Sequence, residues 1–177
     1  MKSRDEAAYV EYVGGCQDRL RRTAYLMTGD WALASDITQE VLIKLYVAWP
    51  RLDRGPGLPT YVRRTIMSSV IDLKRKQKRR REDVIAEPET LPIGDGSDGR
   101  ADRDALMRAL TEVPPRQRAC VVLRYFEELS IAETAEILKC SEGNVKSQTA
   151  RALDALRRLL DDAAWIGPIV AELEGAR

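Results

Sequence analysis

The stretch that decides the fold of this chain reads SIAETAEILKCSEGNVKSQ, residues 130–148. Ser130 followed three residues later by Glu133 has the spacing of a capping box, in which two side chains satisfy the first free backbone amides of a helix. The pattern predicts a helix of about two turns, a connection at Lys139 and Cys140, and a longer helix capped by Ser141. Two capped helices joined by so tight a turn predict a helix-turn-helix.

The second helix of this motif carries polar side chains on the face that is not needed for packing. Asn144, Ser147, Gln148 and Arg151 stand at i, i+3, i+4 and i+7, hence on one face, and Lys146 flanks them. Such side chains bind base edges and phosphates, and those in the N-terminal half of a recognition helix enter the major groove. These five residues are therefore predicted to bind DNA, the alternative being a solvated polar face on a surface helix.

Hydrophobic periodicity predicts further helices on both sides of the motif. Upstream they cover residues 4–28, 31–49 and 60 to about 82, with Thr60 as the cap of the third, and a Gly- and Pro-rich loop at 51–59. The 31–49 segment is the clearest, because an apolar residue recurs every fourth position from Leu33 to Trp49. Two shorter helices follow residue 104. The expected fold class is all-α.

Charge is segregated along the chain, although the net charge is only +1. Residues 74–81 read KRKQKRRR, whereas 82–104 is strongly acidic, and local fields decide what a surface binds. The acidic stretch also contains several Pro and Gly residues, which predicts a flexible linker; a calcium loop is disfavoured because the alternating ligands and terminal Glu are missing. The expected organisation is two small helical domains, 1–82 and 104–161, with a linker at 83–103 and a tail at 162–177.

Several classes of function are disfavoured by what the chain lacks. It has no His and three scattered cysteines, Cys16, Cys120 and Cys140, so a zinc site and a disulfide framework are not expected. Without His or a paired cysteine, catalysis is not expected either. No apolar signal core or membrane-length apolar run is present. We expect a cytoplasmic protein that is not an enzyme and needs no metal or cofactor.

Two further motifs give the chain a family resemblance. Residues 113–138 read VPPRQRACVVLRYFEELSIAETAEIL and residues 143–148 read GNVKSQ, which resembles region 4 of the extracytoplasmic-function (ECF) group of bacterial sigma factors. Residues 36–41, DITQEV, with Lys44 and Trp49, resemble region 2 of the same group. The chain is most similar to actinobacterial members, and the resemblance covers roughly residues 5–160. It implies a protein that binds core RNA polymerase and directs promoter-specific transcription initiation.

The resemblance also implies roles for individual residues. The minus-35 element would be read by the five residues of the predicted recognition helix. Docking on the clamp helices of the polymerase β′ subunit would use the polar strip Asp36, Gln39, Glu40 and Lys44, although a salt-bridged surface is the alternative for that strip. The C-terminal domain would meet the β flap. The minus-ten element would be bound by Tyr61, Arg63, Arg64, Ser68, Lys74, Arg75 and Lys78. The family often has Trp at position 61, Asn at 68 and Arg at 148, so base preference is expected to differ.

Other functions and partners stay open at this point. A free-standing activator or repressor would share the helix-turn-helix, but such proteins usually dimerise, and no dimerisation helix follows residue 161. An enzyme that acts on nucleic acid is the second alternative. An anti-sigma factor is a further candidate partner, because such proteins commonly hold ECF family members. The tail, apolar at 163–171 but broken by Gly-Pro, is expected to pack on the second domain or to contact a partner.

Overall fold

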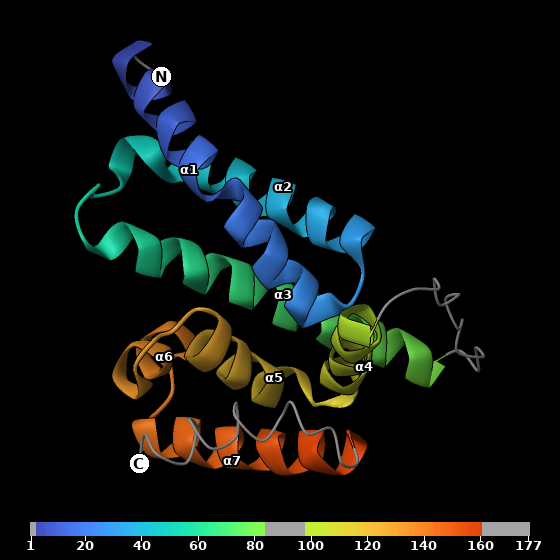
Figure 1. Cartoon of the computed structure of the whole chain (residues 1–177). Coiled ribbons are helices and arrows are strands. Elements are labelled where there is room, and N and C mark those ends of the chain that lie inside the picture. The colour runs from blue at the N-terminus through green and yellow to red at the C-terminus, as the bar shows by residue number, and fades with distance from the viewer. Residues whose placement is uncertain (1–2, 84–97, 161–177) are drawn as a thin grey trace.

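The computed structural model describes residues 3–83 and 98–160, and every regular element in these ranges is helical, as expected. The N-terminal half contains α1 (Ser3–Thr28), α2 (Trp31–Ala48), the 3-10 turn η1 (Trp49–Arg51) and α3 (Gly57–Asp83). The C-terminal half contains α4 (Asp98–Glu112), α5 (Pro115–Val121), the π-helical turn η2 (Val122–Phe126), α6 (Ile131–Leu138) and α7 (Glu142–Leu159). Figure 1 shows α5, α6 and α7 lying beneath the layer formed by α1, α2 and α3.

The three helices of the N-terminal half pack as their periodicity predicts. The Asp30 carboxylate accepts hydrogen bonds from the amides of Ala32 and Leu33 and so begins α2. The predicted apolar stripe of α2 faces the core: Ile37, Val41, Leu45 and Trp49 are buried and Leu33 is half-buried. Long-range helix contacts are densest between α1 and α2, and Gly14 and Gly15 do not interrupt α1.

Two helix boundaries differ from the prediction. Helix α3 begins at Gly57 rather than after Thr60, so the expectation that Thr60 caps it was wrong. Pro59 is tolerated because amides in the first helical turn have no acceptor within the helix. Helix α4 begins at Asp98, inside the stretch expected to be linker. The rest of that stretch, 84–97, and the tail at 161–177 lie outside the described residues.

One apolar core joins the two halves. Ala119, Val122, Leu123, Leu129 and Ile137 of the C-terminal half belong to the same buried cluster as the apolar residues of α1, α2 and α3. A second cluster links α4 to α7. Gly29 also lies at the junction: its φ of +75° favours glycine, and a β-carbon there would lie 2.5 Å from Thr111 Cγ2. The halves are thus docked on one another through a shared interior.

Candidate nucleic-acid interface

The helix-turn-helix forms as the two caps predict. Ser130 Oγ accepts a hydrogen bond from the Glu133 amide at 3.1 Å, and the Glu133 carboxylate accepts one from the Ser130 amide at 2.8 Å. Hydrogen bonding to Ser130, first through its side chain and second through its backbone, holds the pKa of the Glu133 carboxyl below its usual value. Helix α6 ends at Leu138, and the left-handed backbone of the next residue, Lys139 (φ 50°), turns the chain toward α7. The amide of Asn144 then donates to Ser141 Oγ at 3.2 Å, which confirms the second predicted cap.

Small side chains hold α6 and α7 in place. Ala135, Val145 and Cys120 form a separate buried cluster at the crossing of α5, α6 and α7. Burial raises the pKa of the Cys120 thiol to about 11, so it is a neutral thiol at physiological pH. All three cysteines are free, and each is buried or half-buried, as small apolar residues are.

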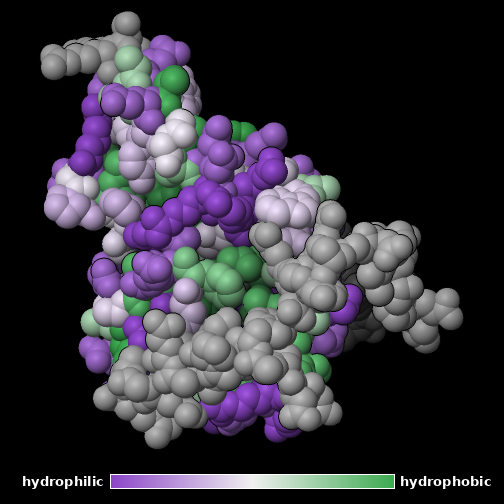
Figure 2. Space-filling view, in the orientation of Figure 1, coloured by the Kyte–Doolittle hydropathy of each residue, from purple (hydrophilic) through white to green (hydrophobic). Residues whose placement is uncertain are grey.

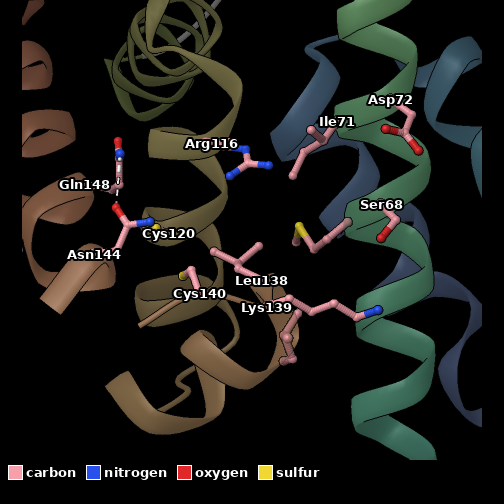
Figure 3. Close-up of a pocket in the computed structure, with 12 residues that line it drawn as sticks. Ser68, Ile71, Asp72, Arg116, Cys120, Leu138, Lys139, Cys140, Asn144 and Gln148 are labelled. Atoms are coloured by element: carbon pink, nitrogen blue, oxygen red, sulfur yellow. Dashed lines mark hydrogen bonds between the residues drawn. The ribbon is translucent and has the colours of Figure 1, made fainter. Parts of the chain in front are cut away.

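The predicted recognition face lies in the N-terminal part of α7. Lys146, Ser147 and Arg151 are exposed, while Asn144 and Gln148 are half-buried. Gln148 Nε2 donates to Asn144 Oδ1 at 3.3 Å, so the two amide side chains form a pair one helical turn apart. Both also line a pocket of about 250 Å³ that opens between α7 and α3 (Figure 3).

The residues predicted to bind the minus-ten element lie on α3, in different environments. Ser68 is exposed and lines the same pocket as Asn144 and Gln148. Tyr61 is half-buried and packs against the shared core. Lys74, Arg75 and Lys78 fall within the helical backbone of α3, but their side chains lie outside the described residues.

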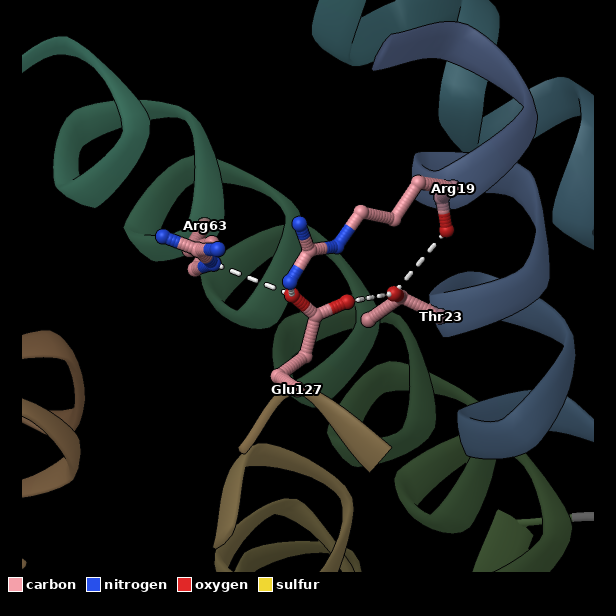
Figure 4. A network of polar contacts seen from close by, with 4 residues as sticks. All are labelled: Arg19, Thr23, Arg63 and Glu127. Carbon is pink, nitrogen blue, oxygen red and sulfur yellow. Dashed lines mark hydrogen bonds and ion pairs between the residues drawn. The ribbon is translucent and has the colours of Figure 1, made fainter. Parts of the chain in front are cut away.

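The two arginines of this set already have partners in the C-terminal half. Arg63 Nε lies 3.0 Å from Glu127 Oε2, and Arg64 Nη2 donates to the Glu136 carbonyl at 3.0 Å. Arg64 also lies 3.5 Å from the Glu136 carboxylate. Figure 4 shows Glu127 pointing from the end of η2 toward the gap between α1 and α3, where Arg19 and Thr23 meet it. Neither Glu127 nor Arg19 stood out in the sequence, since residues far apart along the chain make these contacts: 64 residues separate Arg63 from Glu127, and more than a hundred separate Arg19 from it.

The strip predicted to dock on polymerase is exposed on α2. Asp36, Gln39, Glu40 and Lys44 all face outward, beside the buried stripe of the same helix. Lys44 Nζ lies 2.6 Å from Glu40 Oε1 and donates to Ser69 Oγ at 3.1 Å. Ile43 and Val47 are also exposed on α2, at 64% and 72%. The surface of this helix therefore combines charged groups with uncovered apolar side chains, as protein-binding surfaces often do.

The rest of the described surface offers little for other chemistry. In Figure 2 a band of hydrophilic residues crosses the molecule beside a smaller apolar area. Within residues 3–83 and 98–160 no three His, Cys, Asp or Glu side chains are grouped as a metal ion would need. No helix in these ranges has the length and apolar character to cross a membrane.

Comparison with known proteins places both halves in one family. Residues 13–80 match the family model of sigma-70 region 2, and residues 103–156 match that of sigma-70 region 4. The chain is 36% identical over 152 residues to the RNA polymerase sigma-E factor of Streptomyces coelicolor, covering 86% of this chain and 85% of that one. It is 30% identical over 175 residues to the ECF RNA polymerase sigma factor SigW of Bacillus subtilis, covering 92% and 94%.

Solved structures show the same fold at lower identity. The sigma factor RpoE of Bartonella quintana, solved in complex with the anti-sigma factor NepR, has a TM-score of 0.74 at 22% identity, covering 88% of this chain and 98% of that one. CnrH, solved with the cytosolic domain of CnrY, has a TM-score of 0.66 at 18% identity, covering 89% and 90%. With two region models in the right order and relatives matched along most of their length, the chain belongs to the ECF group of RNA polymerase sigma factors.

Proposed function

We propose that this chain binds core RNA polymerase and directs promoter-specific initiation, with α7 on the minus-35 element and α3 on the minus-ten element. The observation that carries the proposal is the helix-turn-helix with its two capped helices and partly exposed recognition face. It follows a region 2 domain in the chain. The chain would act as an initiation factor in the cytoplasm, with no catalytic site of its own. Its partners are core polymerase, promoter DNA and, as for the relative solved with NepR, an anti-sigma factor.

For the minus-35 element, α7 supplies two kinds of contact. Lys146 and Arg151 are exposed cations that suit phosphates, which fix position but do not read sequence. Gln148 and Asn144 are amides, the side chains that pair with adenine in the major groove. Ser141 caps the N-terminal end of α7, where residues 141–143 are exposed, and that is the end a recognition helix places against bases.

For the minus-ten element, α3 supplies cations and a ring. Arg63 and Arg64 lie one turn before the exposed Ser68, and the basic run at 74–81 continues the same helix. Cations along a groove follow the backbone of a single strand, and an aromatic ring gives a base somewhere to stack. Tyr61 is the ring available at the start of this surface.

For polymerase, we assign docking on the β′ clamp helices to the α2 strip and contact with the β flap to the C-terminal half. The exposure of Asp36, Gln39, Glu40 and Lys44 supports the first assignment. We retain the order of a first domain, a linker, a second domain ending at 161 and a tail at 162–177. Because α4 begins at Asp98, the second domain starts there rather than at 104, and the linker ends at 97.

Reconstituted transcription tests the proposal. The purified chain is mixed with core polymerase, co-purification is measured by gel filtration, and transcripts from a genomic template library are mapped at their starts. We expect a stable complex and start sites that appear only when the chain is present. Specific DNA binding without polymerase association or chain-dependent transcripts would contradict the proposal and favour an activator or repressor.

A further inference from the structure

A second pocket, of about 420 Å³, opens on the surface where α1 meets the C-terminal half. Three of its polar lining residues, Arg19, Thr23 and Glu127, lie where α1 faces the end of η2 (Figure 4). Pockets that take small organic groups measure about 300–1,000 Å³, so this one is large enough for a bulky side chain. The apolar part of its lining consists of Tyr25, Leu26, Trp31, Leu106, Met107 and Phe126.

Two aromatic side chains of this lining are uncovered. Trp31 and Phe126 are each 42% exposed. The Trp31 ring stacks on the Tyr25 ring with 3.9 Å between their centroids, and this contact orients the indole at the edge of the pocket. Exposed apolar surface that is gathered in one place, rather than scattered singly, marks a site where another segment binds.

The rim of the pocket is positively charged. Arg22 lines the pocket, and the Arg21 guanidinium lies 5.1 Å from the centre of the Trp31 ring. Among the residues that the structure describes, neither arginine forms an ion pair with a carboxylate. The carboxylate in the lining, that of Glu127, already lies between two other arginines. The pocket therefore suits an occupant with a large apolar side chain and carboxylates close to it.

The segment that follows α7 has this composition. Residues 161–177 read DDAAWIGPIVAELEGAR, and their apolar run at 163–171 contains Trp165. Two acidic residues precede the run and two follow it, against a single arginine in the segment. An aromatic side chain among carboxylates is complementary to an apolar pocket with a cationic rim.

The end of α7 brings this segment within reach of the pocket. Leu160 is buried in the same cluster as Met107, and Met107 also lines the pocket. Trp165 follows Leu160 by five residues, which span at most about 18 Å when extended. The Trp165 indole can therefore reach the pocket without any movement of α7.

We propose that the segment at 161–177 binds back on the folded body, with Trp165 in the pocket and its acidic residues beside Arg21 and Arg22. The occupant is thus part of the same chain, and it contacts α1 of the N-terminal half together with α4 and η2 of the C-terminal half. The inference goes beyond the proposed function and does not depend on it, because it uses no contact with DNA or polymerase.

Fluorine NMR of the full-length chain labelled with fluorotryptophan tests the docking. The Trp165 resonance is the one missing from Trp165→Phe, and its shift between H2O and D2O reports how exposed the indole is. Phe126→Ser and Arg22→Glu change the pocket at exposed positions, so the fold should tolerate both. Val10→Ser and Arg51→Glu make the same changes at exposed positions outside the pocket lining and are the matched controls.

In the parent, we expect the Trp165 resonance to lie away from its position in the urea-unfolded chain and to show less than half of the solvent isotope shift seen there. Phe126→Ser and Arg22→Glu should move it toward the unfolded position and restore the isotope shift, while both controls match the parent. Circular dichroism confirms that each variant is folded. If Phe126→Ser does not fold, Arg22→Glu decides alone.

Three results would overturn the proposal. The first is a Trp165 indole that is as exposed in the parent as in the unfolded chain, which would leave the pocket to a separate partner. The second is protection that persists in the folded pocket variants, which would place the segment elsewhere on the body. The third is protection that appears only at high protein concentration, which would indicate binding to a second copy. A failure of the chain to direct transcription would change none of these measurements, so the two proposals fail separately.

Discussion

The guanidinium of Arg63 and the carboxylate of Glu127 meet at 3.0 Å, although 64 residues separate them in the sequence. The contact joins α3 to the end of η2 and therefore crosses from one half of the molecule to the other. A buried charge pair of this kind adds little net stability, because desolvation offsets the attraction, but removing one partner is costly.

Arg118 is expected to be the main polar anchor of the docked halves. It is 2% exposed, and its guanidinium donates to the carbonyls of Met27 in α1 and of Thr111 and Val113. Burial lowers its pKa to about 10, so it keeps its charge at neutral pH. Arg118→Leu should lower the free energy of unfolding by about 2–3 kcal/mol, because buried carbonyls lose a charged donor.

Arg116 on the same helix is the control for that measurement. It is exposed, so Arg116→Leu should change stability by no more than about 0.5 kcal/mol in a urea titration. Equal effects of the two substitutions would show that Arg118 contributes no more than a surface arginine.

Glu40 is expected to contribute to polymerase binding. Glu40→Ala removes an exposed carboxylate from the α2 strip and with it the ion pair at 2.6 Å to Lys44, which keeps its hydrogen bond to Ser69. The affinity for core polymerase should fall roughly tenfold, equivalent to about 1.4 kcal/mol, while promoter preference is unchanged. Glu11→Ala, an exposed carboxylate on α1, is the control in the same binding titration and should have no effect. Intact affinity in Glu40→Ala would mean that the docking surface lies elsewhere.

Gln148 and Lys146 are expected to differ in the kind of DNA binding they support. Gln148→Ala should relax base preference at one position of the minus-35 element, with a discrimination loss of about 1–3 kcal/mol. Lys146→Ala should weaken all sequences alike and reduce the salt dependence of binding, because it removes a phosphate contact. Binding measured on a set of single-base variants at two salt concentrations separates the two. A uniform loss in Gln148→Ala would refute its role as a base reader.

The capping box is expected to depend on pH. Hydrogen bonding holds the pKa of Glu133 below its usual value, so its stabilisation is present above the ordinary Glu pKa and is lost as pH falls through the lowered one. Ser130→Ala should cost about 1 kcal/mol at neutral pH. The difference in melting temperature between parent and variant should shrink on acidification, and a constant difference would exclude the coupling to Glu133.

The cysteines are expected to react at different rates. Burial raises the pKa of the Cys120 thiol to about 11 and also raises that of Cys16, which keeps both in the unreactive thiol form near pH 8. Because Cys120 is buried and Cys140 is only half-buried, iodoacetamide should alkylate Cys140 before Cys120, as followed by peptide mass spectrometry. Alkylation of Cys120 ahead of Cys140 in the folded chain would show that the α5–α7 crossing opens more readily than its packing indicates.

The features that the sequence predicts well are local ones. The caps at Ser130 and Ser141 and the stripe from Leu33 to Trp49 depend on residues within one or two helical turns, so spacing alone identifies them. The start of α3 was predicted wrongly because Pro59 reads as a helix breaker, yet it fits a first turn.

The junction of the two halves could not be predicted in this way. Glu127 reaches Arg63 and Arg19 only because η2 is a π turn and the halves share a core, and neither fact has a local signature in the sequence. The prediction that Arg63 and Arg64 bind DNA gave no sign that Glu127 and Glu136 of the C-terminal half contact them.

Promoter selection from a randomised library tests the central claim most directly. Core polymerase and the purified chain transcribe templates whose upstream sequence is randomised, and the transcribed templates are sequenced. If the chain reads both promoter elements, the transcribed templates should be enriched in two sequence blocks, one near minus-35 and one near minus-ten. With the Gln148→Ala variant, the sequence of the minus-35 block should change. Enrichment of a single block, or no enrichment that depends on the chain, would contradict it.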